Sequence, residues 1–163
     1  MMIEELSETD LYSLDPLLDE LVSANKSLGF RPDYQQQFHK YLKETIPNPE
    51  VVVFVAKSDE ANVGMIVGLI QDNGPFILPE RIGYVRVAVV SSERRREGIG
   101  MRLWQEMRCW FSARGIDEVQ LCTMIDNEEA RSFWESCGFR VTMEHWRNRL
   151  EMSSKESEVS EEK

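Results

Sequence analysis

The sequence predicts an α/β (α+β) domain built on a mixed, mostly antiparallel sheet. Three observations lead to this fold class: apolar residues at helical spacing near the N-terminus, adjacent β-branched stretches in mid-chain, and alternating helical and strand-like segments after them. The chain of 163 residues fits one domain with its own core, which we place at residues 1–150. The sheet is expected to be parallel only where a helix crosses over between neighbouring strands.

Two helices are expected first. Apolar residues recur at helical spacing over Thr9–Ala24, with Pro16 as a break or kink in that helix. A second helix is predicted over Pro32–Thr45, and Pro47 and Pro49 close it. These helices, together with the loop Asp72–Arg81, are expected to shape the pocket for whatever the protein acts on.

A β-hairpin and a third strand are expected next. Glu50–Lys57 is rich in β-branched residues, and the polar turn Ser58–Asn62 leads to a returning strand over Val63–Gln71. The segment Asp72–Arg81 contains Gly and Pro and is predicted to be a loop. The strand Ile82–Val90 follows it.

The rest of the chain alternates helices and strands. Apolar residues on one face predict a helix over Ile99–Ala113. A strand over Val119–Met124, a helix over Asn127–Ser136 and a last strand over Phe139–Leu150 complete the expected order. The alternating apolar residues of that last strand are Val141 and Met143.

The bulk composition argues against several classes of function. A net charge of −10 would repel the phosphates of a nucleic acid, so no nucleic-acid partner is expected. No apolar run approaches the ~20 residues that cross a bilayer, and the acidic N-terminus is not a secretory signal. The cysteines and histidines do not have the spacing of a metal site or the makings of a catalytic triad. The cysteines also form no obvious disulfide framework, so a reducing cytoplasm is expected. These residues are Cys109, Cys122, Cys137, His39 and His145.

A strand, a basic turn and a helix come together at residues 85–104. The β-branched run Val85–Val90 leads to Arg94–Arg96, and Gly98 and Gly100 then open the helix. The first N–H groups of a helix have no partner inside it, and the helix dipole adds partial positive charge there. Glycines remove the Cβ atoms that would keep a diphosphate away from those groups. This segment therefore predicts a phosphate-binding site.

Two motifs resemble those of the GNAT-type N-acetyltransferases. Arg95-x-x-Gly98-x-Gly100 resembles the family's (Gln/Arg)-x-x-Gly-x-(Gly/Ala) signature, and Asp126–Phe139 resembles its second signature. Both lie on the expected elements in the expected order. The sequence lacks the GxGxxG of a Rossmann fold, and no Gly-Lys-Ser/Thr of a nucleotide P-loop follows the turn. The resemblance implies a mixed sheet with helices on both faces.

The resemblance also implies which residues bind acetyl-CoA, the cosubstrate. The backbone at the end of the strand is similar to the family's backbone segment that binds the pantetheine arm, and the turn is similar to the family's pyrophosphate loop. Asn127 matches a family position that contacts the cofactor arm. Phe133 matches a family position that packs near that arm. The strand-end residues are Ala88, Val89 and Val90. The loop residues are Arg95, Arg96, Glu97, Gly98, Ile99, Gly100 and Met101.

Each of these residues also has a plain structural interpretation. Val89, Val90 and Phe133 are typical core residues, the glycines permit close packing, and Asn127 is a good helix N-cap. What these interpretations leave unexplained is the joint occurrence of the residues at this spacing.

The reaction that the resemblance implies is transfer of an acetyl group from acetyl-CoA to a primary amine by direct attack in a ternary complex. Backbone N–H groups near Val90 are expected to polarise the thioester carbonyl, and losing one such donor typically costs about 3–4 kcal/mol in the barrier. Holding both reactants on one surface supplies much of the rest.

The acid and base of this reaction stay open. Trp134 stands where the family often has a Tyr that protonates the thiolate, and an indole N–H has no usable acidity near neutral pH. Either another group or water protonates the thiolate, or the free thiolate simply leaves, and Tyr84 and Cys137 are candidate acids by proximity alone. For the base, a water relay is the default. Strand residues Tyr84 and Arg86 replace the family's usual carboxylate, and Glu80 and Glu93 are near in sequence.

Two other functions remain as alternatives. One is a non-catalytic, regulatory CoA-binding module of the same fold, which Trp134 favours. The other is an interaction protein acting through residues 151–163, an acidic segment expected to be a disordered tail. The acceptor amine, small molecule or peptide, is not specified by the sequence, and neither is the oligomeric state, with a homodimer left open.

Overall fold

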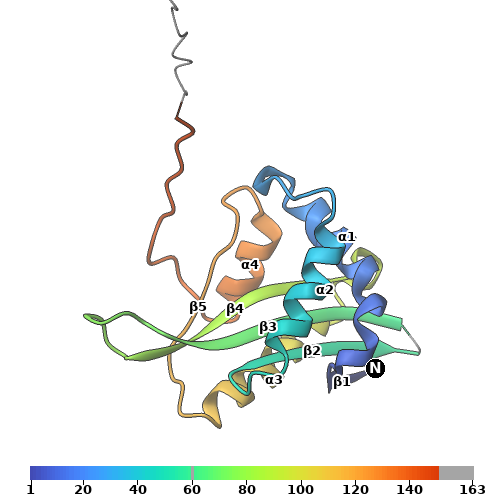
Figure 1. Cartoon of the computed structure of the whole chain (residues 1–163), viewed down its shortest axis with the longest axis horizontal. Helices are drawn as coiled ribbons and strands as arrows, with labels where there is room; N and C mark the ends of the chain where they lie inside the picture. The colour runs from blue at the N-terminus through green and yellow to red at the C-terminus, as the bar shows by residue number, and fades with distance from the viewer. Residues whose placement is uncertain (60, 151–163) are drawn as a thin grey trace, which may run out of the picture.

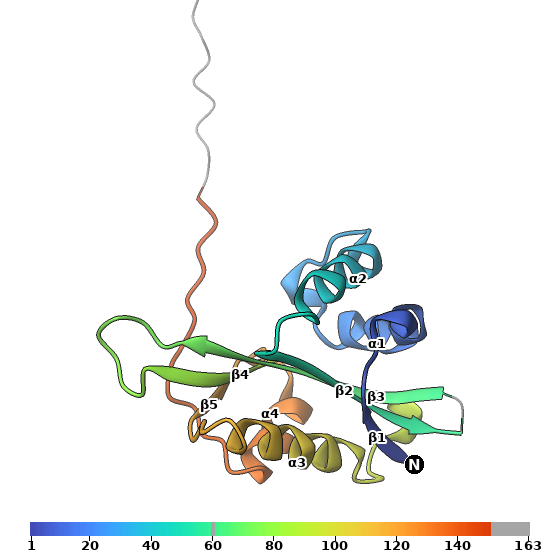
Figure 2. The same ribbon diagram turned by 60° about the horizontal axis from the view of Figure 1, so that its bottom comes forward.

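The computed structural model describes residues 1–59 and 61–150 as a central sheet with helices on both faces (Figure 1). Figure 2 shows α1 and α2 on one face and α3 and α4 on the other. Their bounds are α1 Asp15–Ala24, α2 Tyr34–Thr45, α3 Ile99–Ser112 and α4 Glu128–Ser136. None of the helices in the described part is long and apolar enough to cross a membrane. The tail predicted at residues 151–163 lies outside the described residues.

The sheet has five strands in the order β1-β2-β3-β4-β5. Their bounds are β1 Met2–Glu5, β2 Val51–Ser58, β3 Ala61–Asp72, β4 Arg81–Val90 and β5 Val119–Leu121. The pairs from β1 to β4 are antiparallel, whereas β4 and β5 are parallel because α3 crosses over between them. The predicted mixed, mostly antiparallel sheet is confirmed.

The first strand, β1, is absent from the sequence-based expectation. It pairs with β2 from Met2 opposite Lys57 to Glu5 opposite Phe54. The ammonium of Lys57 also lies 2.5 Å from the Glu4 carboxylate. A short acidic segment carries little β-branched character, so its strand conformation comes from the hydrogen bonds that β2 supplies.

The helices begin differently from the prediction. A 3-10 helix, η1 (Glu8–Leu14), precedes α1, and Pro16 falls in the first turn of α1. Because the first N–H groups of a helix have no intrahelical acceptor, a proline there removes no hydrogen bond. Pro16 therefore starts α1 rather than breaking a longer helix, and α2 begins at Tyr34 rather than at Pro32.

The strand predicted over Phe139–Leu150 is wrong for the chain as described. No strand forms there, and all residues from Arg140 to Leu150 are exposed. The alternation of apolar residues supplies one side of a sheet, but a strand also needs a neighbour for its backbone hydrogen bonds. Strand β5 likewise ends at Leu121 rather than at Met124, because its pairing with β4 stops at Leu121.

Each face of the sheet has its own hydrophobic core. The core beneath α3 and α4 is built from Val52, Ala56, Val63, Ile66, Ile70, Val85, Ile99, Leu103, Trp104, Met107, Phe111, Ile116 and Trp134. The core beneath α1 and α2 is built from Leu6, Leu11, Leu14, Leu17, Leu18, Leu42, Val53, Val55, Met65, Val67 and Val89. A Cβ atom on Gly83 would lie 2.7 Å from the Phe111 ring, so α3 packs this closely on β4 only because Gly83 has no side chain.

Gly83→Ala is expected to lower the free energy of unfolding by about 1–3 kcal/mol, because the added methyl group overpacks the contact with Phe111. Urea denaturation followed by circular dichroism measures the change. Asp72→Ala, at the exposed end of β3, serves as the control and should change stability by less than about 0.5 kcal/mol. Equal stability of the Gly83→Ala variant and the parent chain would contradict the close packing.

Candidate functional site

The site is built around the point where β4 and β5 diverge. β3 pairs with β4 as far as Val90, whereas the pairing of β5 with β4 ends at Val85. On β4, Val85 faces Gly68 and Val87 faces Val67, which leaves Arg86 without a partner in the register. Such a β-bulge bends its strand, and it shifts by one residue which backbone groups face each edge.

The shift turns backbone groups near Val90 toward the gap. The N–H of Ser91 donates to the carbonyl oxygen of Val63 in β3 at 2.9 Å. Because successive residues of a strand direct their N–H groups to opposite edges, those of Ala88 and Val90 point away from β3. The side chain of Arg95 donates to the Val90 carbonyl oxygen at 3.4 Å on this open side.

A cleft of about 540 Å³ lies at this end of the sheet. Its walls come from the C-terminal half of α1, the start of α4 and the loop after β4. Its lining residues are Glu20, Ser23, Ala24, Ser92, Arg95, Asp126, Asn127, Glu128 and Glu129. The fold thus brings Arg95 and Asn127, from the two sequence motifs, to the same cleft.

The N-terminus of α3 has free donors. The N–H of Arg102 donates to the Gly98 carbonyl oxygen at 3.1 Å, so the N–H groups of Ile99, Gly100 and Met101 precede the hydrogen-bond ladder of the helix. Gly98 is left-handed with φ +76°, and no atom lies within 4 Å of a Cβ built there. Together with the helix dipole, this open space suits an anion.

Two of the three arginines of this loop, Arg94 and Arg95, are already paired with carboxylates. Arg94 forms an ion pair with Glu97 at 2.9 Å, which lowers the pKa of the Glu97 carboxyl. Arg95 lies 2.6 Å from Glu129 at the start of α4 and 3.7 Å from Glu20 on α1. Arg95 therefore bridges the two walls of the cleft, and Arg96 is exposed with φ +67°.

Glu20 is a cleft residue that the sequence analysis missed. Its carboxylate accepts hydrogen bonds from the backbone N–H of Ser92 at 3.0 Å and from the Ser92 hydroxyl. These bonds, followed by the charge of Arg95, lower the pKa of Glu20. The apolar spacing of α1 gives no signal for it, since the contact joins residues 72 apart in sequence.

Asn127 and Phe133 have the structural roles that the sequence analysis considered for them, a helix cap and a packing contact. Asn127 caps α4 by accepting from the Ala130 N–H at 3.1 Å, and its amide lies 3.5 Å from the side-chain oxygen of Asn25. A Cβ on Gly100 would lie 3.2 Å from the Phe133 ring, so this glycine lets α3 pack against α4. Asn127 thus lines the cleft while its side-chain amide donates to Asn25.

Several of the predicted site residues direct their side chains into the hydrophobic cores, so only their backbone groups are available to a ligand. The side chain of Val89 lies in the core beneath α1 and α2, and that of Ile99 lies in the core beneath α3. Val90 and Met101 are half-buried against the same α3 core. Ala88 is exposed on β4, at the level where β5 no longer pairs.

The candidate acids and bases lie in different environments. Trp134 is 7% exposed and packs edge-on against Trp104, with ring centroids 5.8 Å apart. Desolvation, and then a hydrogen bond with Cys122, raises the pKa of Tyr84 to about 12. Burial raises the pKa of Cys137. Each of these groups therefore holds its proton at neutral pH.

The carboxylates named from the sequence are both exposed. Glu80 lies in the loop before β4, and Glu93 lies in the 3-10 helix η3 (Ser92–Arg94). Neither lines the cleft. The cleft carboxylates come instead from α1 and from the start of α4.

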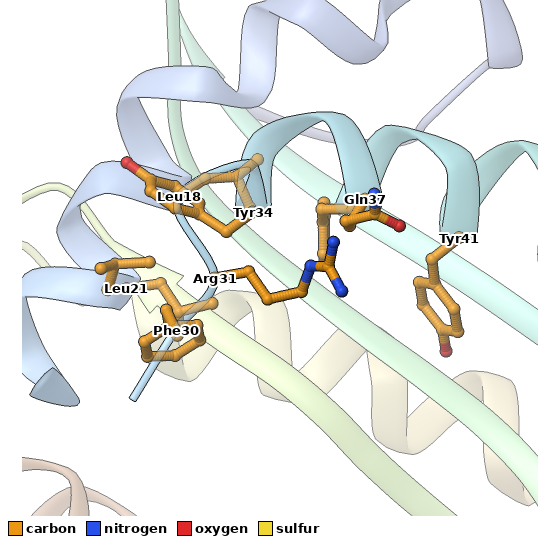
Figure 3. A pocket seen from close by; sticks show the side chains of 9 residues that line it. Leu18, Leu21, Phe30, Arg31, Tyr34, Gln37 and Tyr41 are labelled. Atoms are coloured by element: carbon orange, nitrogen blue, oxygen red, sulfur yellow. The ribbon is translucent and has the colours of Figure 1, made fainter. Parts of the chain in front are cut away.

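A second, apolar groove of about 280 Å³ lies between α1 and α2 (Figure 3). Phe30, Tyr34 and Tyr41 line it, and Arg31 extends along it toward Gln37. Leu18, Leu21 and Val22 of α1 line this groove, whereas Glu20 and Ser23 line the cleft. The two hollows thus share α1 as a wall, and no residue of Asp72–Arg81 lines either of them.

The fold is shared with known acetyltransferases. An aminoglycoside antibiotic 6′-N-acetyltransferase from Acinetobacter haemolyticus superposes with a TM-score of 0.76 at 17% identity, covering 93% of this chain and 99% of that one. A second aminoglycoside acetyltransferase, solved with a bisubstrate analogue containing CoA, gives a TM-score of 0.71 at 19% identity, covering 93% and 98%. At these identities the likeness concerns the fold.

Sequence comparison identifies the family. The N-alpha-acetyltransferase 30 of Schizosaccharomyces pombe is 39% identical over 57 residues, which cover 35% of this chain and 38% of that protein. The chain thus matches well under half the length of this relative. The model of the Acetyltransferase (GNAT) family matches residues 15–139. Because this match includes both motifs and most of the chain, the protein belongs to the GNAT acetyltransferase family.

Proposed function

We propose that this protein transfers an acetyl group from acetyl-CoA to a primary amine, by direct attack of the amine in a ternary complex. The observation that carries the proposal is the position of Asn127, which lines the same cleft as Ser92 and Arg95 of the loop that joins the end of β4, where β5 no longer pairs with it, to the free N-terminus of α3. Each of these features alone is common in α/β folds. Together they provide a backbone-lined gap with an anion site at one end.

The residues present fit acetyl-CoA. The open space at Gly98 and the N–H groups of Ile99, Gly100 and Met101 suit its diphosphate. Ala88 and Val90 offer backbone N–H groups for the amides of its pantetheine arm, and Asn127 offers side-chain N–H donors. Bound acetyl-CoA supplies the acyl group as an activated thioester.

The chain's own groups then have distinct tasks. The Val90 N–H faces the gap and is placed to donate to the acetyl carbonyl oxygen as negative charge develops on it. Arg95 is held between Glu20 and Glu129, and a diphosphate nearby offers its guanidinium a stronger partner. The leaving thiolate needs no strong acid, which agrees with the burial of Trp134.

The charge of the cleft favours a cationic acceptor. Glu20, Asp126, Glu128 and Glu129 line it, whereas Arg95 is the one basic residue among the lining residues. These carboxylates attract an ammonium group, and a water relay to one of them can remove its proton before attack. The two structurally similar proteins are named as aminoglycoside acetyltransferases, so a polycationic amine is one acceptor to test. The yeast relative is named as an N-alpha-acetyltransferase, so a peptide N-terminus is another.

Acetylation of an amine panel tests the proposed reaction. The chain is incubated with acetyl-CoA and an aminoglycoside, a polyamine or a peptide with a free N-terminus, and products are followed by mass spectrometry. We expect release of free CoA only with an amine, together with an acetylated product. CoA binding without turnover on the entire panel would instead support the non-catalytic CoA-binding alternative.

Gly98→Val is expected to weaken CoA binding by roughly 10- to 100-fold, the equivalent of one charged hydrogen bond of about 1.5–3 kcal/mol. The added side chain occupies the open space that a diphosphate needs beside α3. Isothermal titration calorimetry with CoA measures the change.

Gly115→Val is the matched control, because Gly115 ends the same helix with φ +73° and open space around it. Both substitutions strain a left-handed residue, at a cost of about 1–3 kcal/mol in stability. Only the Gly98 variant should lose affinity. Equal affinities of the two variants for CoA would remove the loop from the diphosphate site.

Trp134→Phe is expected to lower the free energy of unfolding by about 1–3 kcal/mol while changing kcat by less than about threefold. Trp134 packs within the aromatic cluster beneath α4, so its loss removes contact area and no acid. Thermal denaturation and steady-state kinetics at a temperature below the transition separate the two effects. A large fall in kcat with the fold intact would assign Trp134 to the chemistry.

A further inference from the structure

Two side-chain contacts fasten the end of α1 to the start of α4. Arg95 lies 2.6 Å from the Glu129 carboxylate on α4 and 3.7 Å from the Glu20 carboxylate on α1. The side-chain amide of Asn127 lies 3.5 Å from the side-chain oxygen of Asn25, the residue that follows α1. The two walls of the cleft are therefore joined by polar contacts between residues far apart in the sequence.

The proposed binding of acetyl-CoA draws on the same two side chains. Its diphosphate offers a partner to the guanidinium of Arg95, and its pantetheine arm offers one to the amide of Asn127. Arg95 also donates to the Val90 carbonyl oxygen at 3.4 Å, on the side of β4 that faces the gap. These side chains are thus engaged in holding α1 and α4 together, so the acyl donor competes with the contacts between the walls.

The ion pairs of Arg95 are exposed enough to exchange. The side chain of Arg95 is 33% exposed and that of Glu129 is 57% exposed. Exposed ion pairs contribute little to stability, because water screens them. A diphosphate carries more charge than a carboxylate and accepts charge-assisted hydrogen bonds from the guanidinium fork. Arg95, in the loop that leads into α3, therefore gains by turning from the carboxylates to a diphosphate at the N-terminus of that helix.

The Glu20 carboxylate keeps its place and its charge when the guanidinium turns away. The backbone N–H of Ser92 donates to it at 3.0 Å, and the Ser92 hydroxyl donates to it as well. These bonds are the main cause that lowers the pKa of Glu20, and they do not depend on Arg95. Glu20 and Glu129 both line the cleft, so an ammonium group in the cleft supplies the positive charge that Arg95 withdraws.

Resting on the proposed function, we propose that Arg95 is exchanged between two sets of anions: the carboxylates of Glu20 and Glu129, and the diphosphate of the acyl donor. Binding of the donor draws the guanidinium away, and the two carboxylates then accept the ammonium group of the acceptor. An ammonium group on the carboxylates likewise releases Arg95 to the diphosphate. Because the two binding equilibria are linked, each ligand raises the affinity of the protein for the other by the same factor.

Calorimetric titration with CoA, in the presence and in the absence of putrescine, tests this coupling. CoA carries no acetyl group, so no transfer takes place during the measurement. Sodium chloride keeps the ionic strength equal in the two titrations. We expect the parent chain to bind CoA at least about fivefold more tightly when putrescine is present.

Variants of neighbouring carboxylates separate the exchange from the overall charge of the cleft. Glu129→Gln removes a partner of Arg95, and it should reduce the effect of putrescine on CoA affinity to less than about twofold. Glu128→Gln is the matched control: it removes the same charge from the same helical turn and the same cleft, but Glu128 takes no part in the ion pairs of Arg95. This control should keep the coupling of the parent chain.

Variants of neighbouring arginines test the other partner. Arg95→Gln should abolish the coupling and should tighten the binding of putrescine alone, because no guanidinium then competes for the carboxylates. Arg96→Gln removes the same charge from an exposed arginine of the same loop, and it should leave the coupling in place.

Each result decides for or against the exchange. A CoA affinity that putrescine leaves unchanged overturns the exchange alone, since the proposed acetyl transfer is judged separately on the amine panel. Equal losses of coupling in the Glu128→Gln and Glu129→Gln variants also overturn it. A parent chain that does not bind CoA overturns both proposals. Coupling in a chain that acetylates no amine supports the exchange together with the non-catalytic alternative.

Nuclear magnetic resonance of the arginine side chains follows the movement of Arg95 directly. Its Nε–H signal is identified by its loss in the Arg95→Lys variant, and it should shift when CoA is added. The signal of Arg114, whose guanidinium lies 4.2 Å from the centre of the Trp110 ring, serves as a reference and should stay in place. An Arg95 signal that does not move at saturating CoA would contradict the exchange.

Discussion

The divergence of β4 from β5 is the constraint on which the candidate site depends. A sheet normally pairs every backbone group of an interior strand, and here β4 continues to Val90 while β5 pairs with it only as far as Val85. The bulge at Arg86 sets which groups face the gap. The proposed binding surface is therefore made of main-chain atoms, whose positions depend on strand register rather than on particular side chains.

Side chains contribute by closing the walls around this gap. Arg95 joins α1 to α4 through Glu20 and Glu129, and Ser92 fastens Glu20 to the loop after β4. These contacts neutralise part of the positive charge that the basic loop would otherwise offer to a phosphate. The proposed anion site thus relies on the helix N-terminus and its free N–H groups more than on net positive charge.

The two layers of helices have separate tasks. In the α3 and α4 layer, Asn127 at the start of α4 lines the cleft, α3 approaches the sheet closely because Gly83 leaves room for Phe111, and α3 packs against α4 because Gly100 leaves room for Phe133. The α1 and α2 layer packs on the opposite face through leucines and supplies Glu20 to the cleft and an apolar groove beside it.

The sequence by itself determined the order of elements from α1 to α4, the mixed sheet, the family and the two motifs, because periodicity, turn residues and cap residues are local properties. Only the tertiary structure decided which strands have neighbours: β1 forms because β2 receives it, whereas Phe139–Leu150 stays outside the sheet despite its alternation. Long-range packing likewise brought Glu20 to the cleft and buried Trp134, since contacts between residues far apart in the chain leave no local pattern.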